Sequence, residues 1–302
     1  MVGEKTGKNM TTNKFLIIGL PRSGTTYLAT LLNSHQDIEC SGELFNPHGI
    51  IGIGEADNSF ESIAKRDAKP HKFFSDFFSK QTNAKALGFK FMIGHNADIL
   101  KSIHKYPNIS IIYIFRENKL AQISSLLVAL KTKSWALTEN TKNSAINAKK
   151  RAVRKVVEKV KSMTSASSHK YLNSLKNGSP SLENNLPETN LLGAGPKAIS
   201  QKWHEYETFD YLFAIWLKSI PNRRLVVEYR SLFDKEFPKK ICAFLDVPYD
   251  EKMESDLLKQ SPNKIIDRFE YRELIANYFE QRGLGRWTGT ELPNNDESSD
   301  NS

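Results

Sequence analysis

This chain of 302 residues has few cysteines and no long apolar runs. The only cysteines are Cys40 and Cys242, which excludes a disulfide scaffold and favours a reducing compartment. No apolar run reaches the roughly 18 to 20 residues of a membrane span. The polar residues 1–14 lack the apolar centre of a secretory signal peptide. We therefore expect a cytoplasmic protein without a transmembrane segment.

The composition nevertheless supports a folded and basic protein. Hydrophobic residues make up 39% of the chain, with 17 Phe and 10 Tyr, so a wholly disordered chain is excluded. The net charge is +9, and residues 131–205 hold 14 Lys and Arg against five Glu, which accounts for all of this excess. A basic excess indicates an anionic partner: nucleic acid, a membrane surface, phosphate or sulfate.

Short apolar runs alternate with segments of helical period along most of the chain. We predict strands at 15–19, 38–40, 86–92, 109–115 and 224–229, and helices at 25–34, 97–106, 119–131, 203–219, 231–245 and 268–281. Continuous apolar strands are typical of sheets that are buried on both faces. The pattern predicts a single α/β domain with a mainly parallel central sheet flanked by helices.

Composition divides the chain into four kinds of segment. Residues 1–14 are expected to be a flexible lead, and 15–290 the α/β domain. Residues 131–202, rich in Lys, Ser and Asn, are interpreted as a basic, partly ordered insertion with an amphipathic helix at 148–163. Residues 291–302 are polar and acidic and are expected to be a disordered tail.

A glycine-rich loop, residues 19–26 (GLPRSGTT), follows the first predicted strand and precedes the first helix. Its glycines let the backbone approach an anion, and free N–H groups at the helix start point toward it. Gly19 and Gly24 have the spacing of the nucleotide-binding loop G-x-x-x-x-G-K-[ST], but Thr25 stands at the lysine position. The absent lysine argues against ATP or GTP hydrolysis, and Arg22 is the cation available instead.

The segment 20–28 (LPRSGTTYL) resembles the 5′-phosphosulfate loop of sulfotransferases that use 3′-phosphoadenosine 5′-phosphosulfate (PAPS). The fold of that family is similar to that of nucleotide kinases. The resemblance implies that Arg22 faces the transferring sulfuryl group. It implies that Pro21 and the residues Ser23, Gly24, Thr25 and Thr26 hold the 5′-phosphate. It further implies PAPS as cofactor, adenosine 3′,5′-bisphosphate as product, and no metal.

A second motif joins Arg116, directly after the strand 109–115, to Ser124 in the next helix. Ligands of open α/β sheets lie outside the carboxyl ends of the strands, and arginine binds phosphate through two parallel bonds. The spacing resembles the Arg-x7-Ser pair that holds the 3′-phosphate in sulfotransferases. The segment 282–287 (RGLGRW) resembles the loop over that phosphate in cytosolic sulfotransferases, which implies a cofactor role for Arg282 and Gly283.

A third motif, residues 41–47 (SGELFNP), follows the predicted strand 38–40. Sulfuryl transfer needs a base for the acceptor hydroxyl, and a carboxylate or a histidine can serve. The motif is similar to one in bacterial carbohydrate sulfotransferases of the nodulation-factor type, and this implies that Glu43 is the base. His35 is a rival, but its place at a helix end favours a structural role.

Two further residues are candidates for the substrate region. Lys90 is a charge within an otherwise apolar strand, so it either faces the sulfate or reaches solvent from a sheet edge. His95 follows the same strand and is a candidate for lining the acceptor pocket. Neither assignment is settled by the sequence.

The motifs together predict a PAPS-dependent sulfotransferase with a carbohydrate or glycolipid acceptor, and the basic charge of residues 131–205 favours an anionic one. A tyrosylprotein sulfotransferase is the alternative acceptor class. A P-loop nucleotide kinase would need Lys at position 25 and an Asp where Arg116 stands. Nucleic-acid binding would favour aromatics among the basic residues, and none lies between Lys142 and Lys170. Residues 142–163 offer a peripheral contact with a membrane instead.

Overall fold

The computed structural model describes residues 12–132, 134–135, 191–257 and 264–292. The strands are β1 (Asn13–Gly19), β2 (Ile38–Ser41), β3 (Ile50–Ile51), β4 (Ala56–Asp57), β5 (Ala86–Met92), β6 (Ile109–Phe115) and β7 (Arg224–Glu228). The α-helices are α1 (Thr25–Asn33), α2 (Phe60–Ala68), α3 (Pro70–Phe78), α4 (Ala97–Ser102), α5 (Lys119–Thr132), α8 (Pro196–Ser219), α9 (Phe237–Phe244) and α10 (Arg272–Glu280). Short 3₁₀ turns are η1 (Ile103–Lys105), η3 (Tyr229–Phe233), η4 (Ile266–Arg268) and η5 (Gly285–Thr288).

Five strands form one sheet in the order β2-β5-β1-β6-β7, and every neighbouring pair is parallel. The predicted α/β class with a parallel central sheet is confirmed. Gly19 at the end of β1 lies opposite Met92 of β5 and Ile114 of β6. The strands therefore end together, and the segments that follow them meet at one edge of the sheet.

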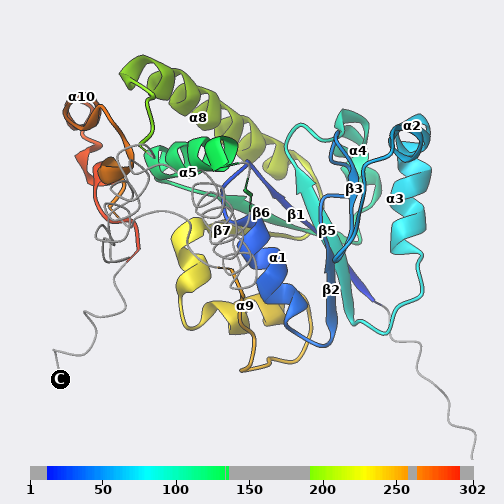
Figure 1. Ribbon diagram of the computed structural model, residues 1–302. Coiled ribbons are helices and arrows are strands. Elements are labelled where there is room, and N and C mark those ends of the chain that lie inside the picture. The colour runs from blue at the N-terminus through cyan, green and yellow to red at the C-terminus, as the bar shows by residue number, and fades with distance from the viewer. Residues whose placement is uncertain (1–11, 133, 136–190, 258–263, 293–302) are drawn as a thin grey trace, which may run out of the picture.

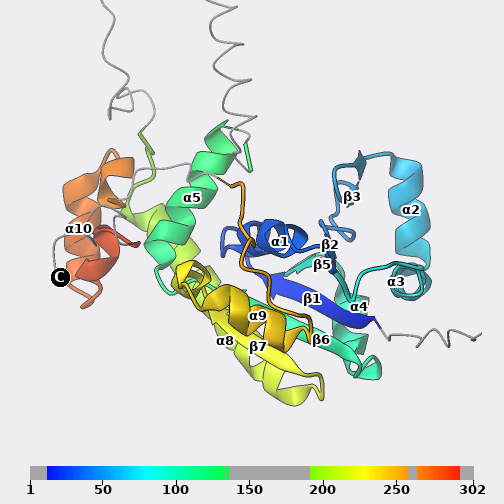
Figure 2. The ribbon, with the colours of Figure 1, turned by 90° about the horizontal axis from the view of Figure 1, so that it is seen from below.

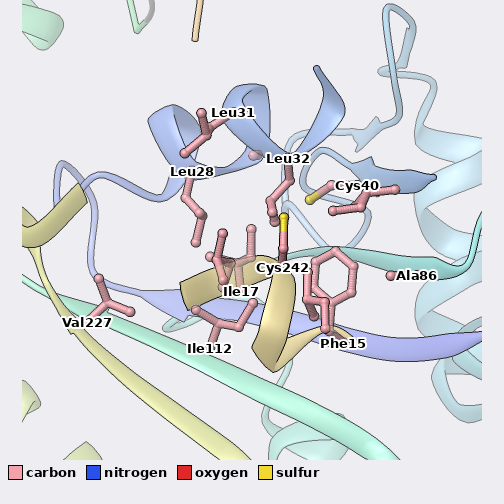
Figure 3. Packing of buried hydrophobic residues seen from close by; sticks show 14 of the residues in the cluster. Phe15, Ile17, Leu28, Leu31, Leu32, Cys40, Ala86, Ile112, Val227 and Cys242 are labelled. Carbon is pink, nitrogen blue, oxygen red and sulfur yellow. The ribbon is translucent and has the colours of Figure 1, made fainter. Parts of the chain in front are cut away.

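Helices cover both faces of the sheet (Figure 1). On one face, Leu28 and Leu32 of α1 pack with Cys242 of α9 over Ile17 and Ile112 of the sheet, as Figure 3 shows. Burying a side chain of this size contributes about 1.5–3 kcal/mol, so the start of α1 is held firmly against the end of β1. The other face is covered by α3, α4 and the second half of α8.

A third apolar cluster joins α5, the first half of α8, α10 and η5. In both views α10 lies at one end of the molecule, while α2 and α3 lie at the other (Figures 1 and 2). Trp203 of α8 and Trp287 of η5 meet edge to face within this cluster, with ring centroids 6.0 Å apart. The chain after α10 is thereby fixed beside the start of α5, next to Arg116.

Three segment boundaries differ from the sequence predictions. Strand β1 begins at Asn13, so residues 13 and 14 belong to the sheet and not to a flexible lead. Helix α8 begins at Pro196, because proline suits the first turn of a helix, so residues 196–202 belong to this helix and not to the insertion expected at 131–202. Glu291 is buried and paired, so the expected disordered tail does not begin there. The predicted helix at 148–163 lies outside the described residues.

The helix predicted at 231–245 is divided into two elements. Residues Tyr229–Phe233 form η3, and α9 begins at Phe237 with Pro238 in its first turn. Proline lacks the N–H that an interior helical position would need, and this explains the division. Among the described residues, no helix is both long and apolar enough to cross a membrane.

Candidate active site at the carboxyl edge of the sheet

The carboxyl ends of the strands bring the candidate residues to one edge of the sheet. The loop 20–24 follows β1, and Glu43 lies two residues after β2. His95 follows β5, Arg116 directly follows β6, and Tyr229 directly follows β7. Residues that are more than 200 positions apart in the sequence are therefore neighbours because the strands are parallel and in register.

The loop between β1 and α1 has a backbone that only a glycine fits at position 24. Gly24 has a φ of 104° and Arg22 a φ of 65°, both in the left-handed region. A Cβ on Gly24 would lie 2.7 Å from Leu232 and 2.8 Å from Tyr229. The glycine is required both by its dihedral angle and by the close packing of the segment after β7.

Polar groups of this loop are left without partners, as an anion site requires. The Ser23 hydroxyl is buried, and no described residue hydrogen-bonds with its Oγ. No described residue accepts a hydrogen bond from the backbone N–H groups of Gly24, Thr25 or Thr26. Buried polar groups normally have partners, and amides at a helix start favour an anion. The loop therefore fits a phosphate group, which agrees with the role expected from the sequence.

The side chain of Arg22 reaches from the loop to α5 and the residues that follow it. Its Nε donates to Ser125 Oγ at 2.9 Å, and its Nη1 donates to the carbonyl of Trp135 at 2.5 Å. Burial and the nearby charge of Arg116 lower the pKa of Arg22. Two guanidinium groups that repel one another in this way would both be stabilised by an anion between them.

Arg268, a residue outside the second motif, contacts Ser124 and lies near enough to Arg116 for the two charges to interact. Arg268 of η4 donates from Nη1 to Ser124 Oγ at 2.7 Å. Burial, followed by the charge of Arg116, lowers the pKa of Arg268 to about 10. Sequence reasoning missed Arg268, since nothing in the sequence distinguishes it from other arginines. Arg268 becomes a candidate site residue only when the fold shows that it is buried and lies near Arg116.

The Arg116 side chain is enclosed by three partner residues, and Arg116 is only 5% exposed. Its Nη1 donates to the carbonyl of Arg22 at 3.1 Å, and its guanidinium lies 4.1 Å from the ring centre of Tyr229. Its Nε donates to Glu291 at 2.7 Å, and Nη2 donates to the second oxygen of the same carboxylate. Burial opposes the charge of Arg116, but Glu291 outweighs it and raises the pKa. Arginine thus presents here the two-bond edge that binds carboxylate or phosphate.

Glu43 lies in a second polar cluster on the β5 side of the loop. Lys90 lies 3.0 Å from Oε1, and Asn46 donates to Oε2 at 2.7 Å. Lys90 also donates to Thr26 Oγ1 at 2.9 Å, so it connects Glu43 to the phosphate loop. Burial opposes ionisation of Glu43, but the charge of Lys90 and these hydrogen bonds outweigh it and hold the pKa below its usual value. Lys90 is buried between Glu43 and Thr26 and does not reach solvent from a sheet edge, and its contact with a sulfate stays a prediction.

His95 approaches the other side of this carboxylate. Its Nδ1 accepts the N–H of Met92 at 3.2 Å, so a neutral ring carries its proton on Nε2, which lies 3.6 Å from Oε2 of Glu43. Burial lowers the pKa of His95 to about 4, although Glu43 acts in the opposite direction. His95 is therefore a neutral donor near pH 7. A second proton could bind only at Nδ1, and it would break the hydrogen bond that Nδ1 accepts from Met92.

The loop that carries Glu43 is fastened by Arg66 of α2, a residue that the sequence analysis did not single out. Its Nη1 donates to the carbonyls of Leu44 at 3.1 Å, Asn46 at 2.8 Å and Gly49 at 3.3 Å. Arg66 is only 3% exposed, so these bonds are shielded from water. Arg66 thereby fixes the turn that brings Asn46 onto Glu43.

Two candidate assignments are not brought into this site. Arg282 stacks on Tyr278, 3.5 Å from the ring centre, and donates to the carbonyl of the same residue. Gly283 lies three residues after α10 and has a φ of 68°. Neither residue contacts the loop, Arg116 or Ser124 in the described hydrogen bonds, so their cofactor role stays a prediction.

His35 has the structural role favoured by the sequence. Its Nε2 lies 2.8 Å from the carbonyl of Pro248, and its Nδ1 accepts the N–H of Asp37. Within the described parts of the chain, no group of three or more His, Cys, Asp or Glu side chains could hold a metal ion.

The fold and these contacts define a parallel α/β protein with a glycine-containing loop after β1 and a buried arginine after β6, both at the carboxyl edge of the sheet. The model of the sulfotransferase family matches residues 15–168, just over half of the chain. The chain therefore belongs to the sulfotransferase family. This confirms, at the level of the family, the resemblance drawn from the three sequence motifs.

Individual relatives are distant. Nodulation protein H of Rhizobium meliloti (strain 1021) is 23% identical over 124 residues, which are 40% of this chain and 49% of that protein. The chain thus spans about half the length of this curated relative. A crystal structure of a sulfotransferase from Alicyclobacillus acidocaldarius aligns with a TM-score of 0.42 and 14% identity over 91% of this chain and 96% of that one.

Proposed function

We propose that this protein transfers a sulfuryl group from PAPS to an acceptor hydroxyl. The observation that carries the proposal is that two separate groups of anion-binding type lie at one edge of the sheet. The loop at Ser23 offers an unpartnered hydroxyl and free amides, and Arg116 offers a buried guanidinium. PAPS supplies the activated sulfuryl group and carries phosphates at its 5′ and 3′ positions.

The residues of the chain divide between these two phosphates. The amides of Gly24 to Thr26 and the Ser23 hydroxyl would hold the 5′-phosphate, with Arg22 beside them. Arg116 and Ser124 would hold the 3′-phosphate, and we add Arg268 because it already contacts Ser124. A nucleotide kinase is disfavoured, because Thr25 replaces the loop lysine and Arg116 occupies the strand end where an Asp would help to hold magnesium.

Glu43 is our choice of general base over His95. Its lowered pKa keeps the carboxylate ionised near pH 7, so it can accept the proton of an acceptor hydroxyl. Among the described residues, Oε2 is approached by Asn46 and His95, whereas Oε1 is approached by Lys90 alone. Oε1 therefore has the more accessible lone pair. His95 already carries its proton toward Glu43, and we infer that it helps to hold the carboxylate.

We propose a carbohydrate hydroxyl as the acceptor. The distant similarity to nodulation protein H and the residues 41–47 that surround Glu43 support this choice. The net charge of +9 in residues 131–205 favours an anionic glycan, since a basic surface attracts such a substrate. A tyrosine-containing peptide is the competing acceptor.

Transfer of labelled sulfate from PAPS tests this function. The acceptors should be neutral glycans, anionic glycans and tyrosine peptides, and the enzymes should be the unmodified chain and Glu43→Gln. We expect label on glycans, and a turnover about 10²- to 10⁴-fold lower in the variant. Label on peptides alone would reject the carbohydrate acceptor. Normal turnover by Glu43→Gln would reject Glu43 as the base, and phosphoryl transfer from ATP in place of sulfuryl transfer would reject the function.

A further inference from the structure

The partner of Arg116 is an acidic residue from the far end of the described chain. Glu291 lies 175 residues from Arg116 in sequence, and its carboxylate accepts two hydrogen bonds from the Nε and Nη2 edge of the guanidinium. The two residues are only 5% and 8% exposed. This is a buried, two-bond contact and not a surface ion pair.

The contact occupies the edge of Arg116 that a phosphate would use. The third nitrogen, Nη1, donates to the carbonyl of Arg22, and the ring of Tyr229 lies against the guanidinium. The Nε–Nη2 edge is therefore where a bidentate anion can bind, and carboxylate and phosphate both bind arginine in this way. Glu291 and a phosphate cannot hold this edge at the same time.

The chain that leads to Glu291 is anchored before this residue. Trp287 is buried in the third apolar cluster, and its carbonyl accepts a hydrogen bond from Asn118. Beyond it, the carbonyl of Gly289 accepts from Ile265, and Thr290 forms a bridge with Lys264. Glu291 lies four positions after Trp287. Glu291 can therefore leave Arg116 while the tryptophan stays in place.

We propose that Glu291 is an internal ligand of the second anion site, which the 3′-phosphate of a bound nucleotide displaces, so that Glu291 sets nucleotide affinity and selectivity. The inference rests on the proposed function. Nucleotides with a 3′-phosphate must break the Arg116–Glu291 pair, whereas nucleotides without it leave the pair intact. Glu291 consequently weakens the binding of 3′-phosphorylated nucleotides only, and it favours release of a product that keeps this phosphate.

Calorimetric titration of Glu291→Gln with two nucleotides tests the proposal. Glutamine keeps the size of the side chain but places an amide NH₂ against one donor of Arg116. We expect adenosine 3′,5′-bisphosphate to bind about tenfold or more tightly than it does to the unmodified chain, because one charge-assisted pair no longer has to be broken. Adenosine 5′-monophosphate should bind with unchanged affinity. Glu273→Gln, an exposed residue of α10, removes the same charge and should change neither affinity.

Two outcomes would overturn the proposal. Unchanged or weaker binding of the bisphosphate by Glu291→Gln would mean that Glu291 only supports Arg116. Unchanged hydrogen exchange of residues 289–292 in the unmodified chain, on addition of the bisphosphate, would mean that Glu291 is not displaced. The second measurement needs no variant, so it decides the question even if Glu291→Gln does not fold. If the unmodified chain fails to prefer the bisphosphate over the monophosphate, the proposed function itself is wrong.

Discussion

Replacing Lys90 with methionine should move the pH dependence of the reaction in a direction that the structure fixes. The Lys90 ammonium lies 3.0 Å from Glu43, and the two side chains are 9% and 21% exposed. An opposite charge this close lowers the pKa of a carboxyl group by about 1–3 units. Methionine keeps most of the volume of the side chain but removes that charge. Burial would then act on Glu43 without opposition from this lysine.

The expected shift is upward. In the unmodified chain the pKa of Glu43 lies below its usual value, so activity should be lost only well below neutral pH. In Lys90→Met we expect the acid limb of the kcat–pH profile to move to higher pH by roughly 2 pH units. This shift is equivalent to about 2.7 kcal/mol in the free energy of ionisation of Glu43. At a pH below both pKa values, the ionised fraction of Glu43 would fall about 100-fold.

The assay is sulfate transfer between about pH 4 and pH 9. PAPS must be saturating, because Lys90 also bonds to Thr26 and its replacement can weaken cofactor binding. Lys85→Met is the matched control. Lys85 precedes β5 and pairs with Asp37 at 2.7 Å at the opposite edge of the sheet, so its removal should leave the acid limb in place. An unchanged acid limb in Lys90→Met would refute either the role of Glu43 or its coupling to Lys90.

Three further substitutions test separate parts of the site. In calorimetric titrations, Arg116→Ala should weaken the binding of adenosine 3′,5′-bisphosphate by about 1.5–3 kcal/mol and should change the binding of adenosine 5′-monophosphate little. Equal losses of affinity for the two nucleotides would contradict a 3′-phosphate clamp. Gly24→Ala should lower the free energy of unfolding in urea by about 2 kcal/mol or more, and by more than Gly54→Ala, whose φ is also positive but whose Cβ would meet nothing within 4 Å. Arg66→Met should reduce turnover about tenfold or more by freeing the Glu43 loop, with bisphosphate affinity unchanged; loss of both would indicate general unfolding.

The parallel sheet was predictable because its strands are continuous apolar runs. Strands β5 and β6 have the bounds that the sequence predicts, Ala86–Met92 and Ile109–Phe115. Helix α8 was predicted to begin seven residues too late, at Trp203. The signal that would have corrected this is Gly195 followed by Pro196, which is a typical helix start.

Contacts between distant segments were not predictable in the same way. The loop at Gly24, Glu43 and Arg116 each carry a local motif, so the sequence identified them. Arg268 and Glu291 belong to no motif: Glu291 is the counter-ion of the buried Arg116, and Arg268 is placed by contacts such as its hydrogen bond to Ser124. A polar, acidic segment is typical of disorder, but a buried guanidinium needs a counter-ion, and that need is visible only once the fold is known.

The comparison of three nucleotides on the unmodified chain tests the central claim most directly. Calorimetric titration should use adenosine 3′,5′-bisphosphate, adenosine 5′-monophosphate, and ATP with Mg²⁺. Two anion sites, at Ser23 and at Arg116, predict that the bisphosphate binds at least about tenfold more tightly than either of the others. Tightest binding of ATP with Mg²⁺ would contradict the account and indicate a phosphotransferase.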